Sequence, residues 1–237
     1  MMDDRSNTTV TLHELQPGDI LACWGTDRVA RFVSLMTSNP LAPRGLRFAP
    51  SHVAVVCDVP GEGLLWVEST TLSDRPCVIN KERFAGVQAH RPGERLGEYL
   101  ATGGRVDVYR LSAIDTLTEA ESEHLKRILI DRFVKKRLTY DYGGALISGT
   151  RIVRRIDGVI LRRFRNLHEV FCSELITAAL QRLCRMNRSD ATQFNPGRLC
   201  RTLVREGTYQ RAGQLAFPDY KKQPAIAAGT ADRREAA

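Results

Sequence analysis

The order of apolar and polar residues predicts strands in the first half of the chain and longer helices in the second half. Residues 51–57 and 64–69 are rich in apolar and β-branched side chains. Gly61-Glu62-Gly63 lies between them as a turn, so we expect an antiparallel hairpin. Residues 105–111 alternate polar and apolar positions, which also favours a strand. Shorter strands are expected at two further places, 20–22 and 77–79.

Helical spacing of apolar residues marks four other stretches. A short helix is expected at 25–36, and a longer one opens with the capping box Thr118-Glu119-Ala120-Glu121 and ends at the basic residues 135–137. A last short helix is expected around Leu199–Val204. Another helix begins near Cys172 and carries one apolar stripe, formed by Leu175, Ile176, Ala179, Leu180 and Leu183.

Together these elements predict an α+β fold in a single domain that covers residues 13–215. Hydrophobic residues make up 43% of the 237, enough to form a core without disulfides or a structural metal. We expect a disordered arm at 1–12 and a disordered tail at 216–237, because both ends are rich in small, polar and charged residues. The N-terminus has no apolar signal core, and no apolar run reaches membrane-spanning length. The expected localisation is therefore cytoplasmic or otherwise soluble.

The cysteines are spread through the chain and form neither a CxxC pair nor a Cys/His cluster. This spacing argues against a structural zinc site, and the chain length argues against a disulfide scaffold. We therefore expect reduced thiols in a reducing compartment. The six cysteines are Cys23, Cys57, Cys77, Cys172, Cys184 and Cys200.

Cys172 is the cysteine whose position points to chemistry. It stands at or beside the first turn of its predicted helix, where unpaired backbone N–H groups and the helix dipole favour a thiolate. A thiol enzyme also needs a base and a group that orients the base. The predicted hairpin places His52, which starts its first strand, and Glu68, which is near the end of its second, at the same end of the ribbon. The alternative is that Cys172 fills space under the helix and that His52 and Glu68 are structural.

Five segments, taken in order, carry a resemblance to a known family. They are Pro17-Gly18-Asp19-Ile20, Ser51-His52-Val53-Ala54-Val55-Val56, Val67-Glu68-Ser69, Tyr140-Asp141-Tyr142 and Phe171-Cys172-Ser173-Glu174-Leu175-Ile176. Over roughly residues 15–200 the chain resembles the circularly permuted papain-like cysteine hydrolases, the YiiX/YebB-like branch of the NlpC-type superfamily. The resemblance implies a small antiparallel sheet or barrel packed against the helix that bears the nucleophile. It implies Cys172 as nucleophile, His52 as general base and Glu68 as the residue that orients the imidazole.

The resemblance also implies a reaction. Cys172 would attack an amide, ester or thioester carbonyl and form an acyl-enzyme, with no metal or organic cofactor. A tyrosine from the 140–142 segment, Tyr140 or Tyr142, would lie near the cysteine and help polarise the substrate carbonyl. The chain departs from the family at Arg198, which stands where a small acidic residue is common, so no role is carried over to that position.

The net charge of +8 is concentrated in residues 151–165, which contain six arginines and one acid. Apolar residues recur every fourth position there, so an amphipathic helix with a basic side is expected, although Gly158 weakens it. The segment is either an ordinary solvated face or a contact with a membrane surface or an anionic substrate. Nucleic acid is not the expected partner, because aromatic residues are few and no recognised binding motif is present. The contact would be made through Arg151, Arg154, Arg155, Arg162 and Arg163.

Three functions follow from these features. The preferred one is a thiol amidase or peptidase that acts on a cell-wall peptide or another acylated substrate. The second is a lipid-directed thiol acyltransferase or esterase, which would suit the basic segment. The third is a non-catalytic phage- or toxin-associated protein that keeps the fold.

Overall fold

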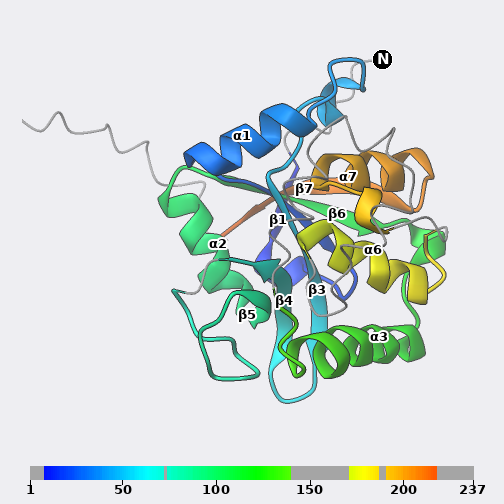
Figure 1. Cartoon of the computed structure of the whole chain (residues 1–237). Coiled ribbons are helices and arrows are strands. Elements are labelled where there is room, and N and C mark those ends of the chain that lie inside the picture. Colours follow the sequence, from blue (N-terminus) through cyan, green and yellow to red (C-terminus); the bar gives the residue numbers. More distant parts are fainter. Residues whose placement is uncertain (1–7, 72–73, 140–170, 187–190, 218–237) are drawn as a thin grey trace, which may run out of the picture.

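A computed structural model describes residues 8–71, 74–139, 171–186 and 191–217 (Figure 1). These residues build one seven-stranded sheet with the strand order β1-β7-β6-β2-β3-β4-β5. Neighbouring strands are antiparallel except β1 and β7, which are parallel. The strands are β1 (Thr9–Thr11), β2 (Ile20–Trp24), β3 (His52–Val59), β4 (Gly63–Thr70), β5 (Gly86–His90), β6 (Arg105–Leu111) and β7 (Tyr209–Ala216).

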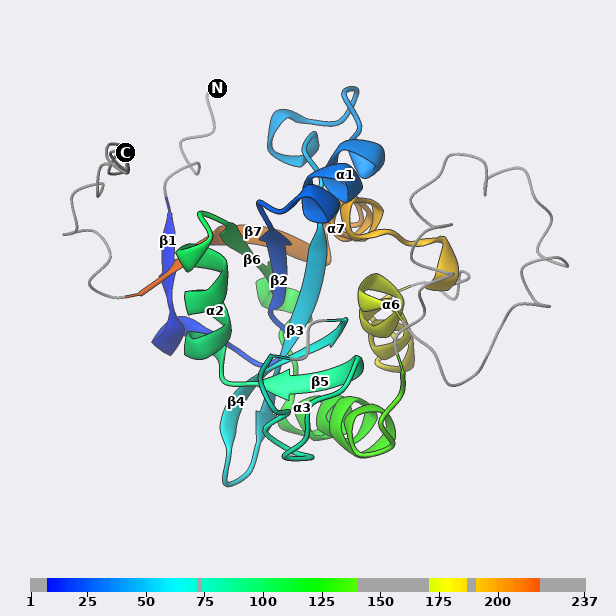
Figure 2. The same cartoon turned by 60° about the vertical axis from the view of Figure 1, so that its left-hand side comes forward.

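Helices cover both faces of this sheet. Figure 2 shows α2 on one side of β2 and β3, with α6 and α3 on the other side. The α-helices are α1 (Arg28–Thr37), α2 (Pro92–Ala101), α3 (Glu119–Lys126), α6 (Cys172–Arg182) and α7 (Pro196–Arg205). A π-helical stretch, Arg127–Val134, continues α3, and short 3-10 turns lie at Leu12–Glu14, Arg44–Leu46, Ala113–Asp115 and Ala191–Gln193. None of the helices in these described ranges has both the length and the apolar character needed to cross a bilayer.

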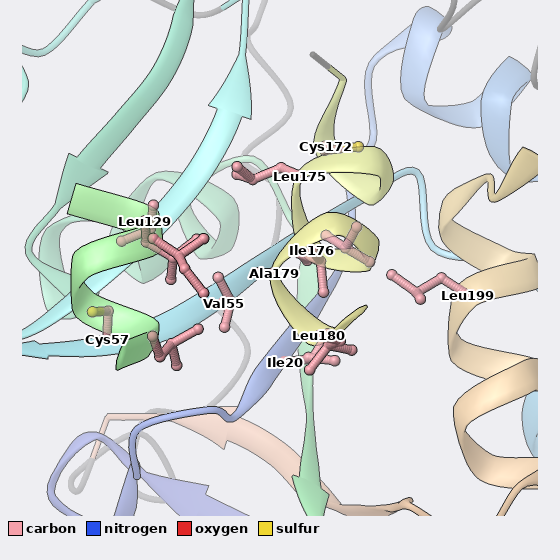
Figure 3. Close-up of a cluster of buried hydrophobic side chains, with 14 of the residues drawn as sticks. Ile20, Val55, Cys57, Leu129, Cys172, Leu175, Ile176, Ala179, Leu180 and Leu199 are labelled. Atoms are coloured by element: carbon pink, nitrogen blue, oxygen red, sulfur yellow. The ribbon is translucent and has the colours of Figure 1, made fainter. Parts of the chain in front are cut away.

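The two covered faces explain why β3 is apolar along most of its length. Val53 and Val55 face the core formed with α3, α6 and α7, whereas Ala54 and Val56 face the core under α2. A strand with both faces covered has no solvent-facing side, so its sequence does not alternate between apolar and polar residues. Figure 3 shows the larger core, where the apolar stripe of α6 meets Val55 of β3 and Leu199 of α7.

Most of the elements expected from the sequence are present. The hairpin of β3 and β4 is confirmed, with Val55 opposite Val67, and so is the strand at 105–111. The helix at 25–36 forms as α1, with the Asp27 side chain accepting from the Ala30 N–H. Thr118 caps α3 through the expected capping box. The α+β class is therefore confirmed, and the sheet packed against the Cys172 helix is present, but that sheet is open at β1 and β5 rather than closed as a barrel.

Two predictions about local structure were wrong, one of a strand at 77–79 and one of disorder over 1–12. Residues 77–79 do not form a strand, because the Cys77 N–H bonds to Glu82 O and Lys81 N–H bonds to Cys77 O, which closes a turn. The disordered arm was placed at 1–12, yet Thr9–Thr11 form β1 beside β7, with Val10 buried. Since Thr11 pairs with Ala216, the ordered unit reaches at least from residue 9 to residue 216.

The packing of α6 predicts a large stability difference between two leucines. Leu175→Ala should lower the free energy of unfolding by about 2–5 kcal/mol, because Leu175 is fully buried and its removal leaves a cavity. Leu35→Ala, at a position that is 75% exposed, should change it by less than about 0.5 kcal/mol. Urea unfolding of both variants checks the difference, and equal losses would contradict this description of the core.

Candidate active site

Cys172 is the first residue of α6, so the start of that helix fixes the position of its thiol. Phe171 precedes it in an extended conformation and provides no side-chain cap. The N-cap side chain therefore occupies none of the N–H groups of the first turn, and the positive end of the helix dipole lies at Cys172. Leu175 and Ile176 are fully buried and anchor the helix against β3 and β4.

His52 and Glu68 meet across the β3–β4 hairpin. His52 is the first residue of β3, Glu68 lies near the end of β4, and the antiparallel pairing brings these ends together. The His52 Nε2 atom lies 2.7 Å from the Glu68 Oε2 atom. The imidazole is 15% exposed and the carboxylate is fully buried. Glu68 thus holds one ring nitrogen, which leaves Nδ1 for a second partner.

Cys172 is a second neighbour of His52, because the two side chains are close enough for each to shift the pKa of the other. Burial raises the pKa of Cys172, but the charge of His52, its hydrogen bond and backbone hydrogen bonds from Val53 and Ser173 outweigh burial and lower the pKa below its usual value. Burial lowers the pKa of His52, yet Cys172 and Glu68 together raise it to about 10. The two shifts have opposite signs, and both favour the thiolate–imidazolium form of the pair over the neutral form.

Glu68 has a second strong partner that the sequence did not reveal. Arg95 of α2 donates from Nε to Glu68 Oε1 at 2.6 Å, and its guanidinium lies 5.0 Å from the centre of the Tyr99 ring. Burial raises the pKa of Glu68, but Arg95 first, and then His52 and His90, lower it far below the usual glutamate value. The carboxylate is therefore ionised although it has no exposed surface.

The geometry shows how these groups come from opposite faces of the sheet. Alternation along β4 puts Glu68 on the same face as Trp66, which belongs to the core under α2. Cys172 belongs to the other core, with α6. His52 is the first residue of its strand, so its ring lies at the end of the sheet, between Glu68 on one face and Cys172 on the other. The candidate site is a chain of contacts that runs from α2, around the end of the sheet, to α6.

His90 also lies at this site, at the end of β5. Its Nε2 atom is 3.9 Å from Glu68 Oε1. Burial lowers the pKa of His90, although the Glu68 charge opposes this shift, so the charged form of His90 is less favoured here than in solvent. A hollow of about 420 Å³ borders His90, Arg95 and Glu68, but Cys172 is not among its lining residues, so this hollow does not serve the thiol.

Other predicted site residues lie outside the described residues. They are Tyr140, Tyr142 and the arginines at 151, 154, 155, 162 and 163. Arg95 and His90 were missed because nothing in their local sequence links them to Glu68. The nearest signal is the spacing of Leu96, Tyr99 and Leu100 behind Pro92, which favours a helix but does not show what Arg95 contacts. Within the described ranges no three His, Cys, Asp or Glu side chains are grouped so that they could hold a metal ion.

The buried Glu68–Arg95 pair makes the stability of the protein depend on pH. Glu68→Gln should cost up to about 3–5 kcal/mol near neutral pH, because it removes the fully buried counter-ion of Arg95 and leaves only the partly exposed Glu98 carboxylate to pair with that charge. The folded-state pKa of Glu68 lies below its unfolded value of about 4.3, so its contribution is present above that value and is lost as the pH falls below it.

The difference between wild type and Glu68→Gln should therefore shrink when urea unfolding is repeated near pH 3. Glu123→Gln is the matched control, since Glu123 is about half exposed and pairs only with Lys126 at 2.7 Å. A Glu68→Gln cost that stays constant with pH, or that equals the control, would show that the carboxylate is not held ionised by its neighbours.

The chain was compared with family models, with curated proteins and with solved structures. No family model matches the chain, and no curated protein matches it. Among solved structures the chain is similar to the metalloprotein YiiX of Escherichia coli O157:H7, assigned to DUF1105. The two are 12% identical, with 86% of this chain and 89% of that one covered and a TM-score of 0.41.

Proposed function

We propose that this protein is a cysteine hydrolase of the permuted papain-like kind, with Cys172 as nucleophile, His52 as general base and Glu68 as the group that orients it. The observation that carries the proposal is the grouping of these three residues: His52 Nε2 lies 2.7 Å from the buried Glu68 carboxylate, and the His52 and Cys172 side chains shift each other's pKa. Nucleophile, base and orienting acid in mutual contact are the arrangement that thiol enzymes need, whatever their order along the chain. Its resemblance to the YiiX/YebB-like sequences supports the same reading.

The proposed reaction starts from the thiolate. Cys172 Sγ attacks an amide, ester or thioester carbonyl, and the free N–H of Cys172 in the first turn of α6, with one further donor, stabilises the oxyanion. The His52 imidazolium gives its proton to the leaving amine or alcohol, and an acyl-enzyme remains. Neutral His52 then takes a proton from water, which attacks the acyl-enzyme and releases the acid. Glu68 keeps the ring in the required orientation throughout.

The first candidate substrate is a cell-wall peptide or another acylated amide, which makes the protein an amidase or peptidase. A lipid-directed acyltransferase or esterase is the second candidate, and the exposed apolar surface of α1 favours it. The arginines at 151, 154, 155, 162 and 163 would help to attract an anionic substrate or surface in either case. A non-catalytic phage- or toxin-associated protein that keeps the fold is the outcome if the thiol proves inert.

Alkylation tests whether Cys172 is an activated thiol. Near pH 6, iodoacetamide should label Cys172 at least about tenfold faster than Cys184, because Cys184 is exposed but has no histidine in contact with it in the described structure. Burial raises the pKa of Cys57 and of Cys200 to about 12 and that of Cys23 well above its usual value, so these three should label slowly. His52→Ala should remove the advantage of Cys172. Peptide mapping by mass spectrometry gives the rates, and labelling of Cys172 no faster than that of Cys184 would rule out the activated thiol.

An acyl-enzyme tests the reaction itself. After incubation with muropeptides, simple esters or phospholipids, an active substrate should leave its acyl mass on the Cys172 peptide and release amine or alcohol. Cys172→Ala should give no adduct, and His52→Ala should slow its formation by about a hundredfold or more. Acylation by muropeptides would identify the protein as an amidase or peptidase, whereas acylation by phospholipids would identify it as a lipid-directed acyltransferase or esterase. A rapidly alkylated Cys172 with no acylation by any class would favour the non-catalytic alternative.

A further inference from the structure

Exposed large apolar side chains are concentrated in one part of this protein. All but Ile114 of those in the described ranges lie between residues 29 and 48, which we call the 29–48 surface. Leu35 is 75% exposed, Leu41 is 93% exposed and Phe48 is 77% exposed. Exposed large apolar side chains that are concentrated in one part of a protein often mark a contact site. The full set is Val29, Phe32, Leu35, Met36, Leu41 and Phe48.

The helix α1 presents its large side chains outward. Of the residues that face the protein at helical spacing, Ala30, Ser34 and Thr37 are small or polar, Val33 is the one larger apolar residue, and Thr37 is the buried one. The large apolar residues Val29, Phe32 and Leu35 point to solvent. An ordinary surface helix has the opposite arrangement, with its larger apolar residues turned toward the core. The amphipathic pattern of α1 is therefore suited to something outside the chain.

This surface is held in place rather than loosely attached. Asp27 caps α1, and the loop after it is closed by hydrogen bonds from Asn39 N–H to Arg47 O and from Ala49 N–H to Ser38 Oγ, both 3.0 Å. Arg201 of α7 donates to Thr37 O at 3.1 Å. The backbone that carries the exposed side chains is thus fixed to the body of the protein, and the apolar exposure is a built feature of the fold.

The charge of the same stretch is entirely positive. Residues 28–50 contain four arginines and no carboxylate, and all four arginines are exposed: Arg28, Arg31, Arg44 and Arg47. Large apolar side chains bordered by arginines are typical of segments that lie in the interface of a bilayer, where the apolar groups enter the acyl boundary and the cations contact anionic headgroups. We propose that the 29–48 surface docks this protein on an anionic lipid membrane.

The position of the surface relates docking to the candidate site. The α1 helix follows β2, whose Cys23 pairs with His52, and the Gly25 N–H donates to Ser51 Oγ at 3.1 Å. Figure 1 shows α1 at the end of the molecule away from the β3–β4 turn, which is the end where β3 begins. A docked protein would therefore hold the His52 end of the sheet close to the bilayer. If the proposed function is correct, the substrate would be an acyl group at or in the lipid surface; the docking itself does not depend on that function.

Vesicle co-sedimentation of the full chain tests the proposal. The probe is a vesicle of phosphatidylcholine with about one third phosphatidylglycerol, and pure phosphatidylcholine vesicles are the reference. Wild type should bind the anionic vesicles more tightly, and added salt should weaken that binding. Phe32→Glu/Leu35→Glu should bind at least about tenfold more weakly, because the charges oppose insertion. Ile114→Glu is the matched control, since Ile114 is 95% exposed but lies elsewhere, and it should bind like wild type.

Two further variants separate the parts of the proposal. Arg31→Gln/Arg44→Gln should lose about thirtyfold in binding to anionic vesicles and little with neutral ones, given about 1 kcal/mol for each arginine near the surface. Cys172→Ala should bind vesicles like wild type, so a failed hydrolase proposal leaves the docking result intact. Circular dichroism and melting temperature confirm that each variant is folded, which the exposure of all the substituted surface residues favours.

Three results would overturn the proposal. One is a wild type that does not bind anionic vesicles. Another is undiminished binding by the folded Phe32→Glu/Leu35→Glu variant, which would place the lipid contact elsewhere, for example in residues 151–165. The third is a wild type that sediments as a dimer, binds no vesicle and becomes monomeric in that variant, which would assign the surface to a second copy of the chain.

Discussion

The candidate site depends on one buried negative charge, the carboxylate of Glu68. A carboxylate without exposed surface is costly unless charges or hydrogen bonds satisfy it, and here Arg95 and His52 do so at 2.6 Å and 2.7 Å. Arg95 keeps Glu68 ionised, ionised Glu68 favours the charged imidazole, and the charged imidazole favours the Cys172 thiolate. Removing Arg95 would therefore change the chemistry at the thiol although the two residues come from helices on opposite faces of the sheet.

The residues of the candidate site come together at the end of the sheet where β3 begins, and not on either face of the sheet. The α2 helix supplies Arg95 from one face and α6 supplies Cys172 from the other, while β3 begins between them with His52. The α1 helix leaves the same end after β2, which places the exposed apolar surface near the site. The proposed catalytic site and the proposed membrane-docking surface would then lie at the same end of the sheet. An acyl substrate in the lipid surface would be close to Cys172 when the protein is docked.

Local patterns predicted the parts of this protein that depend on nearby residues. The β3–β4 hairpin needed only its apolar runs and the glycine turn, α3 needed only its capping box, and the proximity of His52 and Glu68 followed from the hairpin. The sequence could not show β5, β7 or the contact of Arg95, because these depend on pairings between distant segments. Residues 77–79 were predicted as a strand from their apolar character, yet Cys77 is buried as part of a turn instead. Residue type therefore predicted burial there but not conformation.

The most direct test of the account is the ionisation of Cys172, followed through the ultraviolet absorbance of its thiolate. The difference in absorbance between wild type and Cys172→Ala, titrated from acid to alkaline pH, isolates this one thiol from the other five. The account predicts a thiolate that is already formed at neutral pH, and a transition that moves upward in His52→Ala and, by a smaller amount, in Arg95→Met. A Cys172 that ionises only at or above the ordinary thiol pKa of about 8.5, and that ignores both substitutions, would contradict it.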